Sequence, residues 1–144
     1  KVLAYDPYAK SMPALCERAE TLTGLLSRSD VISLHCPLTD ENRGMINSEA
    51  LAHCKRNAIL VNTARGGLIH SESLLAALRD GTLHSAALDS FTQEPLTAPH
   101  LWQSVENVVI SPHIGGVTDA SYIKMGTVAA GNILAVTDAT TVSS

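Results

Sequence analysis

The sequence has few aromatic residues, no excess of positive charge and no long uninterrupted apolar segment. Its 144 residues include one Trp and one Phe, and 10 Lys and Arg stand against 14 Asp and Glu, for a net charge of −4. A basic face of the kind that binds nucleic acid is therefore not expected. Gly126, Gly131 and Asn132 interrupt the longest helical segment, so the sequence also excludes a transmembrane span.

Cysteine is scarce as well, and the three cysteines form no C-x-x-C pair. An odd number without that spacing predicts neither a disulfide framework nor a metal site, and reduced thiols favour a cytoplasmic protein. The chain has no initiator Met or signal peptide and opens on Lys1-Val2-Leu3, as if within a strand. We interpret it as a piece of a longer protein.

Short apolar segments alternate with helical ones along the chain. Strands are predicted at Val2–Tyr5, Val31–Leu34, Ala58–Val61, Ala86–Leu88 and Val108–Ile110. Helices are predicted at Pro13–Glu20, at Glu49–Cys54 capped by Ser48, at Glu72–Arg79 capped by Ser71 and ended by Gly81, and at Asp119–Val136 after Thr118. Continuous apolar strands are buried on both faces, so the pattern predicts an α/β, doubly wound (Rossmann-type) parallel sheet with helices on both faces. It would span residues 1–136, followed by a polar tail at 137–144.

Polar residues stand where the predicted strands end. They are Asp6, His35-Cys36-Pro37, Asn62-Thr63-Ala64-Arg65, Asp89 and Ser111-Pro112-His113. Ligands of open α/β sheets bind beyond the carboxyl ends of the strands. We therefore expect one end of one sheet to carry all of these residues.

Taken singly, each of these residues has a simpler interpretation. Asp6 before Pro7 is an ordinary turn residue or an acid that binds both hydroxyls of an adenosine ribose, which would favour NAD over NADP. Arg65 is a solvated turn residue or a planar fork for a carboxylate. Glu94 is an exposed loop acid by default, and His113 a hydrogen-bonded loop histidine. The long loop 89–103 favours a functional role.

Several segments together resemble the D-isomer-specific 2-hydroxyacid dehydrogenase family, most closely its 3-phosphoglycerate dehydrogenase branch. The segments are KVLAYDPY (1–8), SDVISLHCPLTDENRGMIN (29–47), AILVNTARGGLIHSESLLAALRDG (58–81), AALDSFTQEPL (86–96) and NVVISPHIGG (107–116). The order of NTARGG, Glu-Pro and Pro-His-Ile-Gly-Gly is highly specific. The resemblance extends from Lys1 to about Val136.

The resemblance implies a hydride transfer between a D-2-hydroxy acid, phosphoglycerate-like, and NAD. The implied catalytic residues are Arg65, which holds the substrate carboxylate and carbonyl, His113 as general acid and base, and Glu94 as its partner. A neighbouring carboxylate favours the protonated imidazole and fixes its tautomer. The implied cofactor-binding residues are Asp6, Cys36, Pro37, Thr63, Ala64, Arg65, Asp89, His113, Gly115 and Gly116.

The sequence departs from the family at two points. It contains no G-x-G anywhere, so the glycine-rich loop that binds the pyrophosphate is missing, as is the first strand that leads into it. Ser90 stands where the family usually has Val. We expect a small 2-hydroxy or 2-keto acid as substrate, a homodimer or homotetramer, and little activity from this chain alone. The alternative is an NAD-sensing, corepressor-like interaction protein of the same fold.

Overall fold

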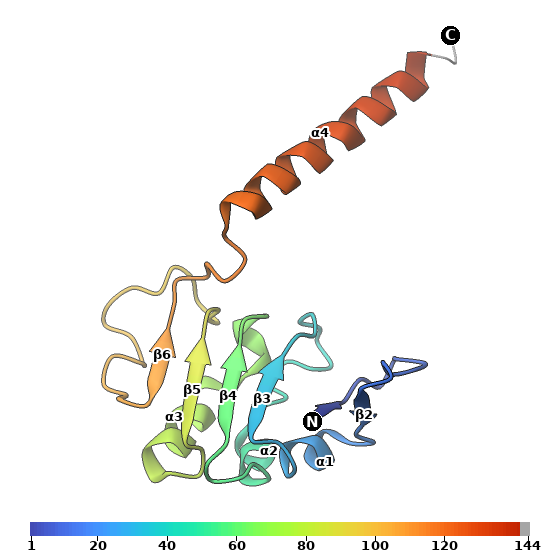
Figure 1. Cartoon of the computed structure of the whole chain (residues 1–144). Coiled ribbons are helices and arrows are strands. Elements are labelled where there is room, and N and C mark those ends of the chain that lie inside the picture. The colour runs from blue at the N-terminus through green and yellow to red at the C-terminus, as the bar shows by residue number, and fades with distance from the viewer. Residues whose placement is uncertain (142–144) are drawn as a thin grey trace. The chain divides into compact units, whose positions relative to one another are not determined.

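A computed structural model describes residues 1–141 of the chain (Figure 1). The chain divides into two compact units, the first from Lys1 to His113 and the second beginning at Ile114.

The centre of the first unit is a four-stranded parallel sheet with the order β3-β4-β5-β6. These strands are β3 (Val31–Leu34), β4 (Ile59–Asn62), β5 (Ser85–Leu88) and β6 (Val108–Ile110). Each strand pairs with the next one along the chain, and all four point the same way (Figure 1). The predicted parallel α/β fold is confirmed, and the carboxyl ends of these strands meet at one edge.

The first strand belongs to a separate sheet. β1 (Val2–Ala4) pairs in parallel with β2 (Cys16–Arg18), where the sequence analysis expected a helix over Pro13–Glu20. That prediction was wrong because tertiary contacts outweigh local propensity: Arg18 donates from its guanidinium to the carbonyl oxygens of Ala9 and Asp6. The expectation that one sheet carries all the polar strand ends fails for Asp6 alone, which follows β1.

The short helices of the first unit differ from the expected ones mainly at their caps. α1 (Leu22–Leu26) was not predicted, and Thr21 caps it by accepting a hydrogen bond from the Gly24 N–H. α2 (Ser48–Ala52) is capped by Asn47 rather than Ser48, because the Asn47 Oδ1 accepts from the Ala50 N–H. An amide oxygen one residue earlier thus takes the cap.

α3 (Ser71–Asp80) follows a 3₁₀ turn, η1 (Gly66–Leu68). Its N-cap is His70, whose Nδ1 accepts from the Ser73 N–H, in place of the predicted Ser71. Gly81 ends α3 as predicted, in the left-handed conformation with φ of 75°. Residues with a Cβ adopt that conformation at a cost, which is why glycine ends helices so often.

The core lies between the four-stranded sheet and the helices behind it in the view of Figure 1. Leu60 of β4, Leu51 of α2 and Leu74 of α3 are almost completely buried there. Burial alternates along β3, however, and Val31 is 60% exposed. We expected both faces of each strand to be buried. One face of β3 is exposed instead, because the described helices α2 and α3 pack against its opposite face.

The second unit contains one long helix, α4 (Asp119–Thr141). Thr118 precedes it as expected, and the Thr118 Oγ1 accepts a hydrogen bond from the Ser121 N–H. The helix continues past Val136, where the sequence analysis ended it; of the expected tail, residues 142–144 lie outside the described residues.

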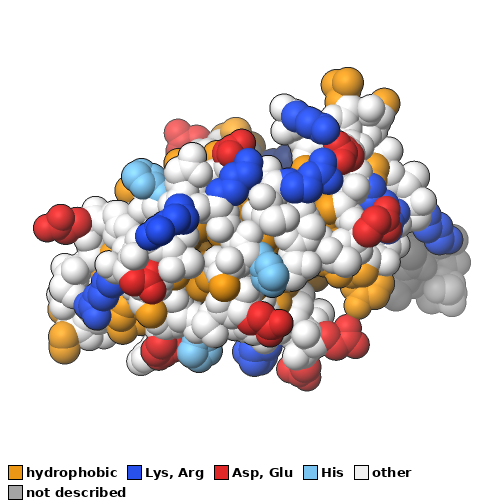
Figure 2. Space-filling view, turned by 90° about the horizontal axis from the view of Figure 1, so that it is seen from below, with side chains coloured by type: hydrophobic (Ala, Val, Ile, Leu, Met, Phe, Trp, Pro, Cys, Tyr) orange, Lys and Arg blue, Asp and Glu red, His pale blue; other side chains and the backbone are white. Residues whose placement is uncertain are grey.

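No helix among the described residues is long and apolar enough to cross a membrane. Acidic and basic side chains are interspersed on the face seen in Figure 2. That mixture agrees with the absence of a basic excess in the composition.

Candidate active site

The turn after β4 is held by one buried amide side chain. Asn62 is completely buried; its Oδ1 accepts from the Ala64 N–H at 3.0 Å and its Nδ2 donates to the Arg65 carbonyl at 2.9 Å. Buried polar groups are costly unless paired, so both bonds favour a single turn conformation. The turn leaves the Thr63 and Arg65 side chains exposed at the carboxyl edge of the sheet.

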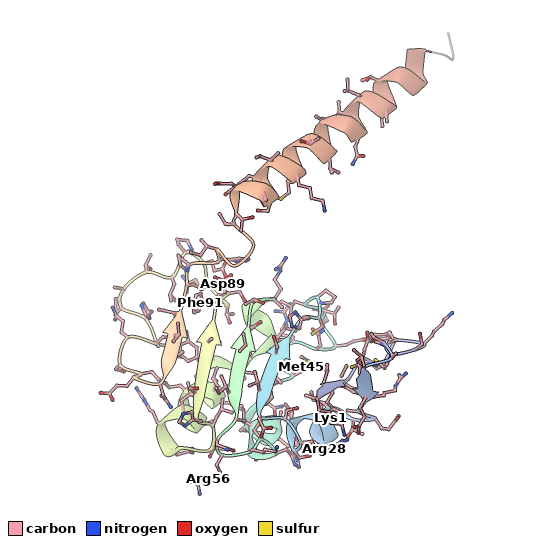
Figure 3. All side chains as sticks on the ribbon, in the orientation of Figure 1. Lys1, Arg28, Met45, Arg56, Asp89 and Phe91 are labelled. Carbon is pink, nitrogen blue, oxygen red and sulfur yellow. The ribbon has the colours of Figure 1, made fainter. Side chains whose placement is uncertain are left out.

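A buried carboxylate follows β5. Asp89 is only 4% exposed, and the hydroxyl of Ser111, just beyond β6, donates to its Oδ1 at 2.5 Å. The Asp89 N–H also donates to the Asn62 carbonyl at 2.9 Å. Asp89 lies at the carboxyl edge of the sheet (Figure 3), where its carboxylate can accept hydrogen bonds.

Glu94 and His113 form an acid–imidazole pair. The Glu94 Oε2 lies 2.8 Å from the His113 Nδ1, and the Glu94 Oε1 accepts from the Phe91 N–H at 2.8 Å. The Phe91 N–H, the imidazole and the charge of Arg65 together hold the pKa of the Glu94 carboxyl below its usual value. Both side chains of the pair are partly exposed, at 36% and 44%.

His113 adopts an unusual backbone conformation. Its φ is 56°, in the left-handed region, and its N–H donates to the Ser111 carbonyl at 3.0 Å. Residues with a Cβ enter this region at some cost, and such positions cluster at functional sites. The conformation directs a histidine to a carboxylate that lies far away in the sequence.

Arg65, Glu94 and His113 are therefore brought together at one edge of one sheet. Glu94 contacts His113, and the residue after Arg65, Gly66, packs against the backbone of Phe91, whose N–H binds Glu94. A cation here can hold a carboxylate, and an imidazole beside it can exchange a proton with a bound molecule.

The segment after β3 lies at the same edge. Cys36 is half-buried, and the Asn42 side chain donates to the Pro37 carbonyl at 2.7 Å and to the Cys36 Sγ at 3.9 Å. Asn42 thereby holds the loop that begins with these two residues.

Three predicted site residues are not among those that this edge brings together. Asp6 follows β1, and its Oδ1 accepts from the N–H groups of Tyr8 and Ala9 at 2.9 and 3.2 Å, as in an ordinary Asx turn. Gly115 and Gly116 belong to the second unit, where the Gly116 carbonyl accepts a hydrogen bond from Ser121.

Sequence reasoning missed the groups that hold the site residues in place. Asn62 and Ser111 had been noted only as members of polar segments, and the Phe91 N–H was not considered at all. An Asn at the end of a strand is a usable signal, because its side chain often bonds to the next turn. A backbone N–H leaves no signal in the sequence.

Comparison with known proteins identifies the family. Residues 1–115 match the model of the D-isomer specific 2-hydroxyacid dehydrogenase, NAD binding domain. The chain belongs to this family. It is 42% identical over 136 residues to the (S)-sulfolactate dehydrogenase of Chromohalobacter salexigens, covering 92% of this chain and 44% of that protein. It is 40% identical over 137 residues to the D-3-phosphoglycerate dehydrogenase of Methanocaldococcus jannaschii, covering 92% and 26%.

Solved structures agree with this assignment. The TT0316 protein of Thermus thermophilus has a TM-score of 0.88 at 41% identity, over 96% of this chain and 43% of that one. The NAD-complexed dehydrogenase of Lactobacillus delbrueckii ssp. bulgaricus has a TM-score of 0.84 at 30% identity, over 96% and 46%. The chain thus spans less than half the length of these relatives, and the family resemblance seen in the sequence is confirmed.

The residues present fit part of an NAD molecule. Asp89 offers a buried carboxylate that can accept from a carboxamide, and the exposed turn at Thr63–Arg65 offers main chain next to it. The sequence provides no G-x-G for the pyrophosphate. The nicotinamide end is therefore the part that this chain fits best.

Proposed function

We propose that residues 1–136 form most of the NAD-binding domain of an NAD-dependent 2-hydroxyacid dehydrogenase. The observation that carries this proposal is the Glu94–His113 contact at the carboxyl edge of the sheet, with the Arg65 turn packed through Gly66 against Phe91, which binds Glu94. The dehydrogenases and reductases among the relatives support an enzyme over an interaction protein.

Arg65 would bind the substrate. Its guanidinium is permanently charged, exposed, and anchored by a hydrogen bond from Nη1 to the Ala64 carbonyl at 2.7 Å. A planar fork of donors matches a carboxylate and the neighbouring keto oxygen of a 2-keto acid.

His113 would move the proton. Its Nδ1 faces Glu94, which leaves Nε2 to donate a proton to the carbonyl oxygen during reduction and to accept the hydroxyl proton during oxidation. Glu94, kept ionised by the Phe91 N–H, stabilises the protonated imidazole and orients its ring. Bound NAD supplies the hydride acceptor, and the protein supplies orientation and charge.

Asp89 and Asp6 would hold the two ends of the cofactor. Asp89 accepts from the carboxamide, Cys36 and Pro37 border the adenine side, and Asp6 binds the ribose hydroxyls and disfavours a 2′-phosphate. The relatives act on sulfolactate, glyoxylate and phosphoglycerate by their names. Among these acids we favour a phosphoglycerate-like substrate, and we expect a dimer or tetramer of the full-length enzyme.

Replacing the proposed proton donor tests the function directly. In the full-length enzyme, His113→Ala is expected to lower kcat by about 10²–10⁴-fold, the usual contribution of general acid–base catalysis. NADH affinity, measured by fluorescence titration, should stay nearly unchanged. His84→Ala is the matched control, because His84 is exposed and lies just before β5, away from the carboxyl edge.

Two outcomes would contradict the proposal. Full turnover by His113→Ala would remove the imidazole from the reaction. Equal loss of turnover and of NADH affinity would assign His113 to cofactor binding instead.

A further inference from the structure

Gly66 directly follows Arg65, is the first residue of the 3₁₀ turn η1, and is buried. Among the described glycines, Gly44 and Gly81 have a left-handed φ, and Gly66 does not. Any residue could adopt the Gly66 conformation. The demand for glycine at this position is therefore one of space.

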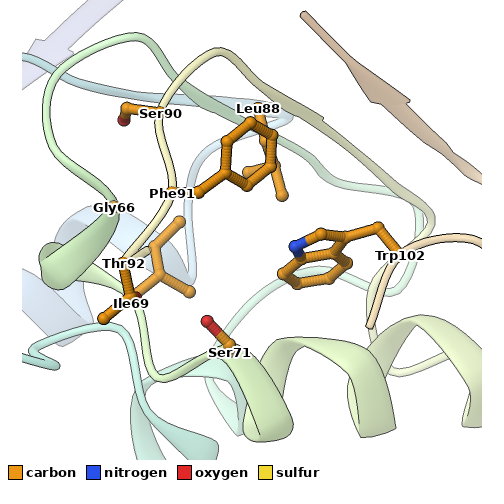
Figure 4. Close-up of a pocket in the computed structure, with 8 residues that line it drawn as sticks. All are labelled: Gly66, Ile69, Ser71, Leu88, Ser90, Phe91, Thr92 and Trp102. Atoms are coloured by element: carbon orange, nitrogen blue, oxygen red, sulfur yellow. The ribbon is translucent and has the colours of Figure 1, made fainter. Parts of the chain in front are cut away.

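The main chain of Phe91 occupies the space that a side chain at position 66 would need. A Cβ at Gly66 would lie 2.1 Å from the Phe91 carbonyl carbon and 2.5 Å from its Cα and its carbonyl oxygen. The two backbone segments run against each other beside a small cavity that Ser90 and Trp102 also line (Figure 4). Backbone, unlike the end of a long side chain, has no easy way to retreat.

Phe91 is also the anchor of the acid–base pair. Its N–H donates to the Glu94 Oε1 at 2.8 Å, and the Glu94 Oε2 meets the His113 Nδ1 at 2.8 Å. The same N–H is the main reason that the pKa of the Glu94 carboxyl lies below its usual value, ahead of His113 and Arg65. Any shift of the Phe91 backbone would therefore move the N–H that binds Glu94 and weaken this hydrogen bond.

The segment on the other side of Gly66 is fixed as well. The Gly67 carbonyl accepts from the Gly44 N–H at 2.8 Å, and the Leu68 carbonyl accepts from the Ile46 N–H at 3.1 Å. A Cβ at Gly66 would therefore meet the Phe91 backbone on one side, while hydrogen bonds to Gly67 and Leu68 hold its own turn in place on the other.

We propose that Gly66 is a positioning residue: its backbone contact with Phe91 sets the Arg65 loop at the distance from the Glu94–His113 pair that the reaction needs. The inference rests on the proposed function, since it assigns Arg65 to the substrate and His113 to the proton. It extends that function by naming the contact that joins these two parts, which come from different loops. Misplacing reacting groups by about 1 Å can cost about 100-fold in rate.

The test compares Gly66→Ala with Gly67→Ala. A Cβ at Gly67 would meet the Leu38 Cδ2 at 2.7 Å, which is the movable end of a side chain, so this neighbouring glycine is a matched control. In the 144-residue chain, the Glu94 carboxyl is titrated by ¹³C NMR. Gly66→Ala should raise the pKa of that carboxyl toward its usual value, and Gly67→Ala should leave it close to that of the unchanged chain.

The same pair of variants is then measured in the full-length enzyme. Gly66→Ala should lower kcat by about tenfold or more, with NADH affinity retained, because orientation is lost while the cofactor contacts remain. Gly67→Ala should be much less affected. If Gly66→Ala does not fold, nuclear Overhauser contacts between the Gly66 Hα and Phe91 protons in the unchanged chain replace it.

The outcomes separate this inference from the proposed function. An unchanged Glu94 titration in Gly66→Ala, or no Overhauser contact in the unchanged chain, overturns the positioning role whatever the activity. Equal losses of kcat in the two glycine variants overturn it as well. If the pKa of Glu94 rises in Gly66→Ala but the full-length protein has no dehydrogenase activity, the proposed function is contradicted. The Gly66–Phe91 contact would still be supported.

Discussion

At the residue scale, the site is built from side chains that the sequence names and from backbone groups that it does not. Arg65, Glu94 and His113 could be singled out because their residue types and flanking Gly and Pro residues form specific motifs, and their roles stay a prediction. The Phe91 N–H that holds Glu94 could not, because every residue except proline carries one. The left-handed His113 was equally hidden, since histidine has no strict preference for that conformation.

Ser111 gives a residue-scale prediction about the buried carboxylate. Its hydroxyl donates to the Asp89 Oδ1, and hydrogen bonds to charged groups contribute about 1.5–3 kcal/mol. Ser111→Ala should therefore weaken NAD binding by about tenfold or more in the full-length enzyme, measured by calorimetry. Ser111→Thr keeps the hydroxyl and should restore affinity. Equal weakening in both variants would mean that space, and not the hydrogen bond, matters at this position.

At the scale of elements, the strands of the four-stranded sheet were predicted better than the helix caps and the β1–β2 pair. The segment VISL was predicted to its last residue because a compact β-branched and apolar run is typical of a buried strand. β2 was mistaken for a helix because Pro13 suggests a first helical turn, while the pairing with β1 depends on residues far away. Asn47 and His70 displaced the predicted caps by one residue, a distance that propensity does not resolve.

The β1–β2 element carries a prediction about pH. Lys1 and Arg28 both pair with Glu17, and these bonds lower the pKa of the Glu17 carboxyl to about 2. A carboxyl whose pKa is lowered by folding stabilises the folded state above its ordinary pKa, near 4.5, and this contribution is lost as the pH falls toward about 2. The Glu17 side chain is 37% exposed, so salt should weaken the effect.

The measurement is urea unfolding of the 144-residue chain between pH 2 and 7. Glu17→Gln should flatten the loss of stability in the acid range, and the exposed Glu20→Gln is the control on the same stretch of chain. Identical pH profiles for the unchanged chain and for Glu17→Gln would show that these ion pairs do not contribute.

At the scale of the whole molecule, the chain matches the family's NAD-binding domain over most of its length. Residues 1–115 match the family model, yet no G-x-G occurs in the sequence. This absence can be read directly from the sequence, and an incomplete pyrophosphate site stays a prediction. The grouping of strands into two sheets was not predicted, since pairing order is a property of the folded chain.

The incomplete site predicts weak binding by the isolated chain. Each missing hydrogen bond to the charged pyrophosphate removes about 1.5–3 kcal/mol, so the 144-residue chain should bind NAD at least about tenfold more weakly than the full-length enzyme. Titration calorimetry of both proteins measures this difference. Equal affinities would place the main cofactor contacts within the residues described above and make the glycine-rich loop dispensable.

The close approach of two backbones at Gly66 also limits which substitutions this turn tolerates. Consider a library that varies the turn around Arg65. Substitutions at Thr63, whose side chain is exposed, should mostly give folded proteins, whereas substitutions at Gly66 should mostly not. The neighbouring glycine, with only the tip of a leucine in its way, tolerates more choices. Two adjacent and chemically identical residues thus differ sharply in their freedom to evolve.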